Sequence, residues 1–190
     1  MKVAVIYGSN RTERQGIKAA KFILNKLDKR NYDTVFIDTM EFNLPLLDKM
    51  HKEFPKGKAP EMLETIHGML ESADGFVIVS GEYNHSIPPA LKNLLDHFQR
   101  EYQFKPGAIV SYSAGAFGGL RVAMHLRALL AELGMSSIPS IFPVPYVQDA
   151  FDNDGTALNE RFNKGVVRFL DEFNWYLSAL KAQRDEGVPN

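Results

Sequence analysis

The chain opens with VAVIYGSNRTERQG, residues 3–16, and this stretch decides the fold. Its first five residues are apolar and include the β-branched Val3, Val5 and Ile6, which predicts a strand buried on both faces. A polar turn follows, and apolar residues then recur at helical spacing from Ile17 to Leu27. In a parallel sheet, the loop between such a strand and helix opens at the carboxyl end of the strand, where ligands bind. Because a helix start offers free N–H groups, the stretch predicts an anion site for a phosphate.

Size and composition narrow the class of protein. With 190 residues and 21.4 kDa the chain can bury a substantial core, so we interpret residues 1–190 as one domain with a frayed tail at 184–190. The formal net charge is −1 and no basic cluster occurs, so neither nucleic acid nor a membrane surface is expected as a partner. The absence of cysteine excludes disulfides, thiolate zinc sites and cysteine nucleophiles. No apolar run suits a signal peptide or a membrane span, so a cytoplasmic protein is expected.

The pattern of strand followed by helix occurs five times. Further strands are predicted at 34–38, 76–80, 108–112 and 138–147, and further helices at 60–72, 88–98, 120–133 and 162–180. Three prolines in the last strand suit an edge position. This alternation predicts an α/β fold with a doubly wound parallel sheet, and five strands favour the flavodoxin-like order 2-1-3-4-5 in three αβα layers. The irregular segment 39–60 is long for a connection, which is typical of a binding loop or a flap.

Small polar loops follow the first, third and fourth predicted strands, and the predicted strand order brings the three loops together. Ser9 and Arg11 in the first loop suit a phosphate, which wants hydroxyl and guanidinium donors. In the second loop, Tyr83 can stack on a planar ligand while Asn84 reads the polar edge of that ligand. The third loop, residues 113–119, has three glycines that let the backbone approach a ligand closely. Taken singly, the first loop is equally explained as a solvated turn, and the second is better explained as a surface loop with an exposed aromatic residue. The third could be only a glycine-rich turn from strand to helix.

Several other kinds of site are not supported. The first loop lacks both G-x-x-x-x-G-K-[ST] and G-x-G-x-x-G, so a terminal monophosphate matches it better than a triphosphate or a pyrophosphate. The histidines at 51, 67, 85, 97 and 125 have no i, i+4 pairing and no cysteine partners, so no metal site is expected. Ser9 is not in a G-x-S-x-G elbow, and no pair of carboxylates suggests acid and base.

Together the three loops resemble those of the NAD(P)H-dependent FMN reductases, flavodoxin-like flavoproteins that include quinone, azo-dye and chromate reductases. The resemblance covers the chain from Lys2 to Leu180. It rests on Gly8-Ser9-Asn10-Arg11 and Arg14-Gln15-Gly16, on Glu82-Tyr83-Asn84 and Pro89-Ala90-Leu91-Lys92-Asn93, and on Ser113-Ala114-Gly115 and Gly118-Gly119. Many members have proline where this chain has Gly81, and a second serine where it has Arg14 or Gln15.

The resemblance implies roles for named residues. The FMN phosphate is expected at Ser9, Arg11, Gln15, Gly16 and the amide of Ile17. The isoalloxazine is expected to lie along Glu82, Tyr83, Asn84 and His85, with Ser113, Gly115 and Gly118 in the loop at its other edge.

The resemblance also implies an activity. Hydride would pass from NADPH or NADH to the flavin, and electrons would then pass to a small acceptor such as a quinone, an azo compound, a metal oxyanion or free flavin. No catalytic side chain is expected, because the cofactor carries the chemistry. Family members are typically homodimers or dimers of dimers, which agrees with the nearly all-apolar helix at 120–133. The alternative is a flavodoxin-type electron carrier or a flavin-binding sensor without turnover. Flavodoxin phosphate loops are rich in Thr and Gly, so Arg11 and Arg14 favour the reductase.

Overall fold

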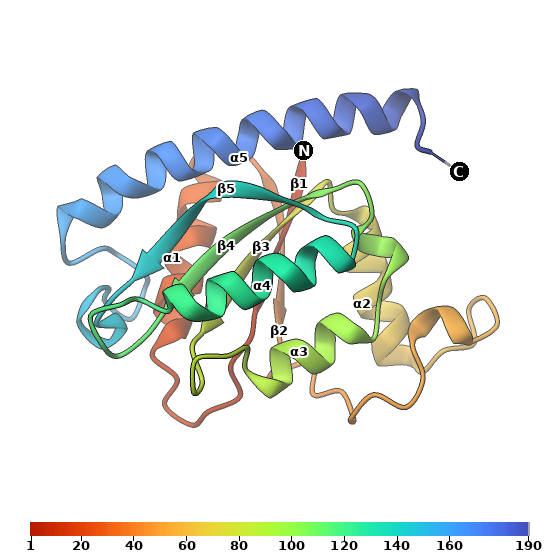
Figure 1. The fold of residues 1–190 in the computed structure, drawn as a ribbon, viewed down its shortest axis with the longest axis horizontal. Helices are drawn as coiled ribbons and strands as arrows, with labels where there is room; N and C mark the ends of the chain where they lie inside the picture. The colour runs from red at the N-terminus through yellow and green to blue at the C-terminus, as the bar shows by residue number, and fades with distance from the viewer. Residues whose placement is uncertain (190) are drawn as a thin grey trace.

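The strands form one parallel sheet. A computed structural model describes residues 1–189 and contains five parallel strands in the order β2-β1-β3-β4-β5 (Figure 1), which confirms the predicted order. The strands are β1 (Lys2–Tyr7), β2 (Asp33–Asp38), β3 (Gly75–Gly81), β4 (Pro106–Tyr112) and β5 (Ser136–Val144).

Helices cover both faces of this sheet, as the prediction of three layers required. They are α1 (Gly16–Asp28), α2 (Glu61–Ser72), α3 (Pro89–Asp96), α4 (Leu120–Glu132) and α5 (Glu160–Glu186), with single 3-10 turns η1 (His51–Glu53), η2 (Arg100–Tyr102) and η3 (Val147–Asp149). Val3 and Val5 pack in one core cluster with α1 and α5, whereas Ala4 and Ile6 pack in a second cluster with α2, α3 and α4. Because successive side chains of β1 enter opposite cores, its sequence is apolar without alternation.

Strand β5 lies at the edge of the sheet, where its prolines can be accommodated. It ends at Val144, three residues earlier than the prediction of 138–147. The reason is local: Pro145 has no N–H for the ladder, and Tyr146 adopts a left-handed conformation with φ 50° before η3 begins. The chain therefore turns back over the carboxyl edge of the sheet at this point.

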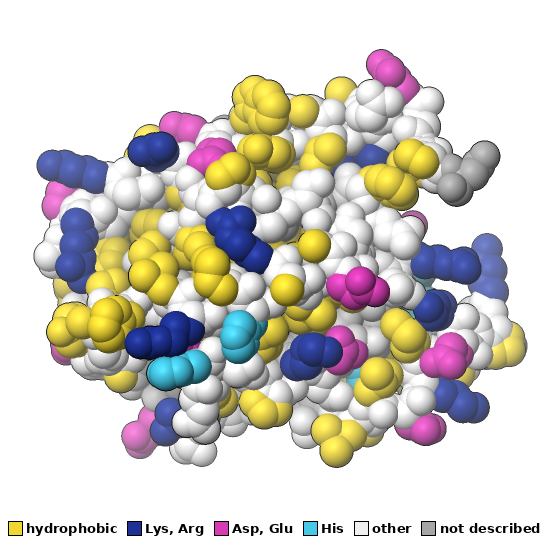
Figure 2. All heavy atoms as spheres, in the orientation of Figure 1, with side chains coloured by type: hydrophobic (Ala, Val, Ile, Leu, Met, Phe, Trp, Pro, Cys, Tyr) yellow, Lys and Arg dark blue, Asp and Glu magenta, His cyan; other side chains and the backbone are white. Residues whose placement is uncertain are grey.

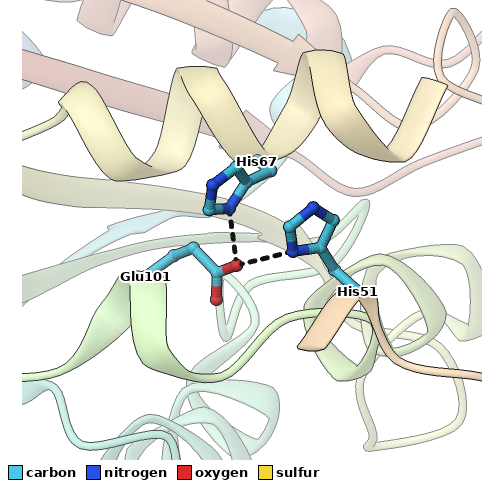
Figure 3. Close-up of side chains that lie close together, drawn as sticks. All are labelled: His51, His67 and Glu101. Carbon is cyan, nitrogen blue, oxygen red and sulfur yellow. Dashed lines mark hydrogen bonds and ion pairs between the residues drawn. The ribbon is translucent and has the colours of Figure 1, made fainter. Parts of the chain in front are cut away.

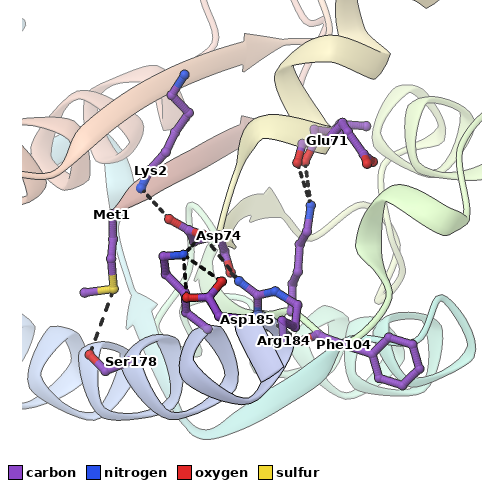
Figure 4. Close-up of polar contacts among 11 residues, drawn as sticks. Met1, Lys2, Glu71, Asp74, Phe104, Ser178, Arg184 and Asp185 are labelled. Atoms are coloured by element: carbon purple, nitrogen blue, oxygen red, sulfur yellow. Dashed lines mark hydrogen bonds and ion pairs between the residues drawn. The ribbon is translucent and has the colours of Figure 1, made fainter. Parts of the chain in front are cut away.

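The last helix is longer than its apolar pattern indicated. The side chain of Asn159 accepts a hydrogen bond from the Arg161 amide at 2.9 Å and so caps the start of α5. At the other end Arg184 donates to the carbonyl oxygens of Phe104 and Asp74 at 3.0 and 3.2 Å (Figure 4). Residues 184–186, which the sequence assigned to a frayed tail, thus form the last turn of α5, and residue 190 of that tail lies outside the described residues. Among residues 1–189, no helix combines the length and the apolar character needed to cross a bilayer.

Candidate functional site

The parallel register brings the ends of four strands to one edge of the sheet. Tyr7, the last residue of β1, lies opposite Asp38 of β2 and Val79 of β3, and Gly81 of β3 lies opposite Tyr112 of β4. The three predicted loops leave from this edge. They enclose a cavity of about 440 Å³, lined by Ser9, Arg11, Thr12, Glu13, Arg14, Gln15, Gly16, Gly81, Glu82, Tyr83, Tyr112, Ser113, Ala114, Val147 and Gln148.

Seven of the predicted site residues line this cavity and five do not. Those on its wall are Ser9, Arg11, Gln15, Gly16, Glu82, Tyr83 and Ser113. Ile17 follows in the first turn of α1, and the remaining four are Asn84, His85, Gly115 and Gly118. A larger hollow of about 570 Å³ lies between β5 and α5, but it contains none of the predicted residues.

The first loop ends at a helix start that has no acidic side chain. The first turn of α1 carries no Asp or Glu, and no side chain of the described residues caps it. The Gln15 side chain is instead turned back on the loop, where it donates to the Glu13 carbonyl at 3.1 Å. Since the first N–H groups of a helix lack intrahelical partners and carry the positive end of its dipole, this start suits an anion.

Ser9 connects the first loop to the second. Its buried hydroxyl lies 2.7 Å from the Tyr83 hydroxyl. The Arg11 guanidinium is exposed and lies 6.0 Å from the centroid of the Tyr83 ring. Within residues 1–189 Arg11 forms no ion pair, so its charge is available to a ligand at the mouth of the cavity.

Arg14 has a different environment from Arg11. Its guanidinium forms a forked ion pair with Asp38, with Nη2 and Oδ2 2.6 Å apart, and it also donates to the Ser9 carbonyl at 2.9 Å. The Asp38 side chain is 2% exposed and that of Arg14 is 15% exposed. Burial alone would lower the pKa of Arg14, but the hydrogen bonds and charge of Asp38 outweigh it and the pKa is raised. Arg14 therefore holds the loop in place rather than presenting a free cation.

Asp38 was not among the residues predicted from the sequence. Its position could have identified it, because Asp38 ends the second predicted strand and the predicted order places that strand beside the first. Residue type alone did not distinguish it from an ordinary turn residue.

Two buried tyrosines lie at the ends of β1 and β4, and one of them, Tyr112, lines the cavity. The hydroxyls of Tyr7 and Tyr112 are 3.5 Å apart. Burial raises the pKa of Tyr7 to about 12 and raises that of Tyr112 well above its ordinary value, so both are neutral at pH 7. A Cβ atom on Gly16 would lie 2.0 Å from the Tyr112 ring, and one on Gly81 would lie 2.9 Å from it. Tyr112 thus explains why glycine, rather than proline, precedes the Glu-Tyr-Asn triplet.

The second loop uses its acidic side chain for structure. Glu82 Oε2 accepts hydrogen bonds from the amides of Arg121 and Val122, at 3.0 and 3.2 Å, at the start of α4. Helix α4 has Gly119 at its N-cap, with no side-chain bond of its own, so Glu82 supplies the missing acceptor. Glu82 thus lines the cavity, while its carboxylate accepts hydrogen bonds from the start of α4.

The tip of the second loop is a tight turn. Tyr83 and Ser86 exchange two backbone hydrogen bonds of 3.0 and 2.9 Å, and the two residues between them have positive φ, 48° at Asn84 and 64° at His85. This is the type I′ geometry, which Asn tolerates well. The turn directs Asn84 and His85 outward, whereas the half-buried Tyr83 ring remains on the cavity wall.

The third loop contributes Ser113 to the cavity wall, while Gly118 allows the loop backbone to pack closely. The Ser113 hydroxyl donates to the Gly115 carbonyl at 3.0 Å. Gly118 has φ 59°, and a Cβ there would lie 2.9 Å from the Pro145 nitrogen, so its role is close packing on the end of β5. Val147 and Gln148 from η3 complete the wall. The sequence did not identify these two residues as part of the site, because the last strand was predicted to run to residue 147 and it ends at Val144.

The chain is similar to known proteins in both sequence and fold. A family model described as NADPH-dependent FMN reductase matches residues 1–149. The chain is 29% identical over 180 residues to 2-hydroxy-1,4-benzoquinone reductase of Burkholderia sp, covering 91% of this chain and 94% of the relative. It is 31% identical over 189 residues to a quinone reductase of Pseudomonas putida, covering 95% of this chain and 96% of the relative. Among solved structures, the flavoenzyme NAD(P)H:(acceptor) oxidoreductase FerB from Paracoccus denitrificans superposes with a TM-score of 0.74 at 24% identity, over 94% of this chain and 97% of that one.

Proposed function

The chain belongs to the NADPH-dependent FMN reductase family, and we propose that it is an FMN-dependent oxidoreductase that takes electrons from NADPH or NADH and passes them to a small acceptor. Two relatives are named as reductases of quinones, so a quinone is the first acceptor proposed, ahead of azo compounds, metal oxyanions and free flavin. One observation carries the proposal at the level of the site. Three loops from separate strands enclose one cavity of about 440 Å³, and its wall carries both donors for an anion and an aromatic ring.

The phosphate of FMN would be held at the first loop. The supporting groups are the buried Ser9 hydroxyl, the Arg11 guanidinium, which has no ion pair within residues 1–189, and the helix start at Gly16 and Ile17. Hydroxyl, guanidinium and amide N–H are the donors that a phosphate dianion prefers. Gln15 lines the same part of the cavity, and its side chain must leave the Glu13 carbonyl to join them.

The isoalloxazine would lie between the second and third loops. Tyr83 and Ser113 both line the cavity, where Tyr83 would supply an aromatic face and Ser113 a hydroxyl. Glu82, Gly115 and Gly118 would act through the backbone, and Asn84 and His85 through the turn that orients Tyr83. When bound, FMN supplies the redox chemistry, which is acceptance of hydride and delivery of two electrons to the acceptor. The residues bind and orient the reactants, and the neutral Tyr112 adds no charge to the cavity wall.

The assembly and location of the protein are part of the same proposal. We infer a homodimer formed through α4, because apolar side chains on this helix and the turn before it are exposed: Phe117 by 64%, Leu120 by 43% and Met124 by 49%. Figure 2 shows this face, where hydrophobic side chains lie beside arginine or lysine and histidine side chains.

Residues 1–190 would form one FMN-binding domain, and a cytoplasmic location would give it access to NADPH and NADH.

The activity is tested with the purified full-length chain. We expect added FMN to bind, and NADPH or NADH to be consumed steadily when a soluble quinone is present. The control is the same FMN concentration without protein. A chain that neither binds FMN nor oxidises either nicotinamide cofactor would overturn the proposal. Flavin reduction without continued turnover would instead support an electron carrier.

A further inference from the structure

We propose that His51, His67 and Glu101 form a binding site for one divalent transition-metal ion of the Zn²⁺ class, separate from the cavity described above. The three residues come from η1, α2 and η2, which are distant in sequence (Figure 3). None of them lines the cavity at the carboxyl edge. Their candidate ligand atoms all lie within 4.8 Å of one another.

The candidate ligand atoms of the three residues lie close together. His67 Nδ1 lies 2.8 Å from Glu101 Oε1, and His51 Nδ1 lies 3.4 Å from the same oxygen. The two imidazole rings are stacked, with centroids 4.0 Å apart and an angle of 15° between their planes. In a tetrahedral zinc site with bonds of about 2.0–2.1 Å, neighbouring ligand atoms are about 3.3 Å apart. To admit the ion, the His67–Glu101 contact must open by a few tenths of an ångström and the two rings must turn out of their stacked arrangement, because a metal ion lies in the plane of each imidazole that binds it.

The outer contacts of the cluster resemble those that orient metal ligands. His51 Nε2 lies 3.3 Å from Glu64 Oε2, and Glu64 Oε1 accepts the Ala59 amide at 3.0 Å. The second oxygen of Glu101 accepts the Gln99 amide at 3.0 Å. A carboxylate on the far nitrogen of a ligating histidine fixes its ring orientation and its tautomer. The cluster thus has both the inner donors and the outer partners of a metal site.

The burial of Glu101 supplies a further argument. Its side chain is 5% exposed, and among residues 1–189 its ion-pair partners are the two histidines, which carry charge only when protonated. A divalent cation beside the Glu101 carboxylate would place positive charge against this buried group, in addition to the hydrogen bond that it accepts from the Gln99 amide. The His51 and His67 side chains are 15% and 34% exposed, so the ion has a path from solvent.

The donor set selects the class of metal. Two imidazole nitrogens and one carboxylate oxygen, with a fourth position left to water, match Zn²⁺ and its neighbours in the transition series. Calcium and magnesium prefer all-oxygen sites. Such an ion would hold the irregular segment 39–60, which carries His51, against α2 and η2. No metal site was predicted from the sequence, because the histidines have no i, i+4 pairing and no cysteine partners.

The test is calorimetric titration of the chelator-treated full-length protein with ZnCl₂, and with MgCl₂ for comparison. We expect one Zn²⁺ per chain, and a loss of affinity of about 10-fold or more in His67→Gln and in Glu101→Gln. His125→Gln removes a histidine elsewhere and should bind Zn²⁺ as the wild type does. Cobalt substitution gives a second measurement, because a four-coordinate site produces a visible absorption spectrum. The proposal would be overturned if the wild type failed to bind Zn²⁺, or if all three variants bound Zn²⁺ equally well.

Discussion

Gly16→Ala is expected to abolish tight FMN binding and to destabilise the protein by about 3 kcal/mol. A Cβ atom at this position would lie 2.0 Å from Cζ of Tyr112 and 2.4 Å from its hydroxyl oxygen. Helix propensity favours alanine over glycine by about 1 kcal/mol, but overlap with a buried ring costs more. We therefore expect the substitution to lower the stability of the protein. The ring or the helix start must move, and both belong to the proposed flavin site. FMN affinity should fall by about 100-fold or more, which corresponds to about 3 kcal/mol.

Gly68→Ala is the matched control for this prediction. Gly68 also lies in a helix, α2, but a Cβ there has no heavy atom within 4 Å. This variant should gain up to about 1 kcal/mol of stability and keep its FMN affinity. Tyr112→Leu removes the ring atoms involved, so the stability loss in the double variant should be smaller than the sum of the single losses. If the stability losses of the two single variants were additive, or if Gly16→Ala behaved like Gly68→Ala, overlap of the new Cβ with the Tyr112 ring could not be the cause. Such a result would contradict this prediction.

Arg14→Ala is expected to lower the free energy of unfolding by about 3 kcal/mol or more, as measured by urea denaturation at pH 7. The substitution leaves Asp38, whose side chain is 2% exposed, without its guanidinium partner. Removing one member of a buried ion pair costs more than the pair contributed, because the remaining charge stays desolvated. The hydrogen bond from Arg14 to the Ser9 carbonyl is lost as well, which releases the first loop.

Arg11→Ala provides the control for Arg14→Ala. Arg11 is exposed and has no ion pair within the described residues, so its removal should change stability by less than about 0.5 kcal/mol. Arg14→Lys keeps the charge but loses the forked geometry, and should fall between the wild type and Arg14→Ala. Equal stability of the two alanine variants would contradict the structural role given to Arg14.

The sequence predicted the strand order and the meeting of the three loops for physical reasons. Five apolar segments of strand length, each followed by a helical pattern, allow few arrangements other than a doubly wound parallel sheet. In that sheet the loops after the first, third and fourth strands must leave from one edge. The observed register, with Tyr7 opposite Val79 and Gly81 opposite Tyr112, confirms this arrangement.

The roles of individual side chains in the loops were not predictable in the same way. Arg11 and Arg14 are three positions apart and chemically identical, yet one faces solvent and the other a buried carboxylate. The loop backbone decides between them, and it includes Glu13 in a left-handed conformation with φ 54°. Glu82 is a comparable case, because its carboxylate accepts hydrogen bonds from two backbone amides of α4, about 40 residues further along the chain. Pairings over such distances leave no periodic signal in a single sequence.

The central claim is that the first loop binds the phosphate of FMN, and comparison of FMN with riboflavin tests it most directly. Riboflavin carries the same ring system without the phosphate. In a fluorescence titration we expect the wild type to bind FMN far more tightly than riboflavin. Arg11→Ala should weaken FMN binding by about 10–100-fold, the equivalent of a charge-assisted hydrogen bond of about 1.5–3 kcal/mol, and leave riboflavin binding unchanged. Equal affinity of the wild type for the two flavins, or an equal loss for both in Arg11→Ala, would contradict the account.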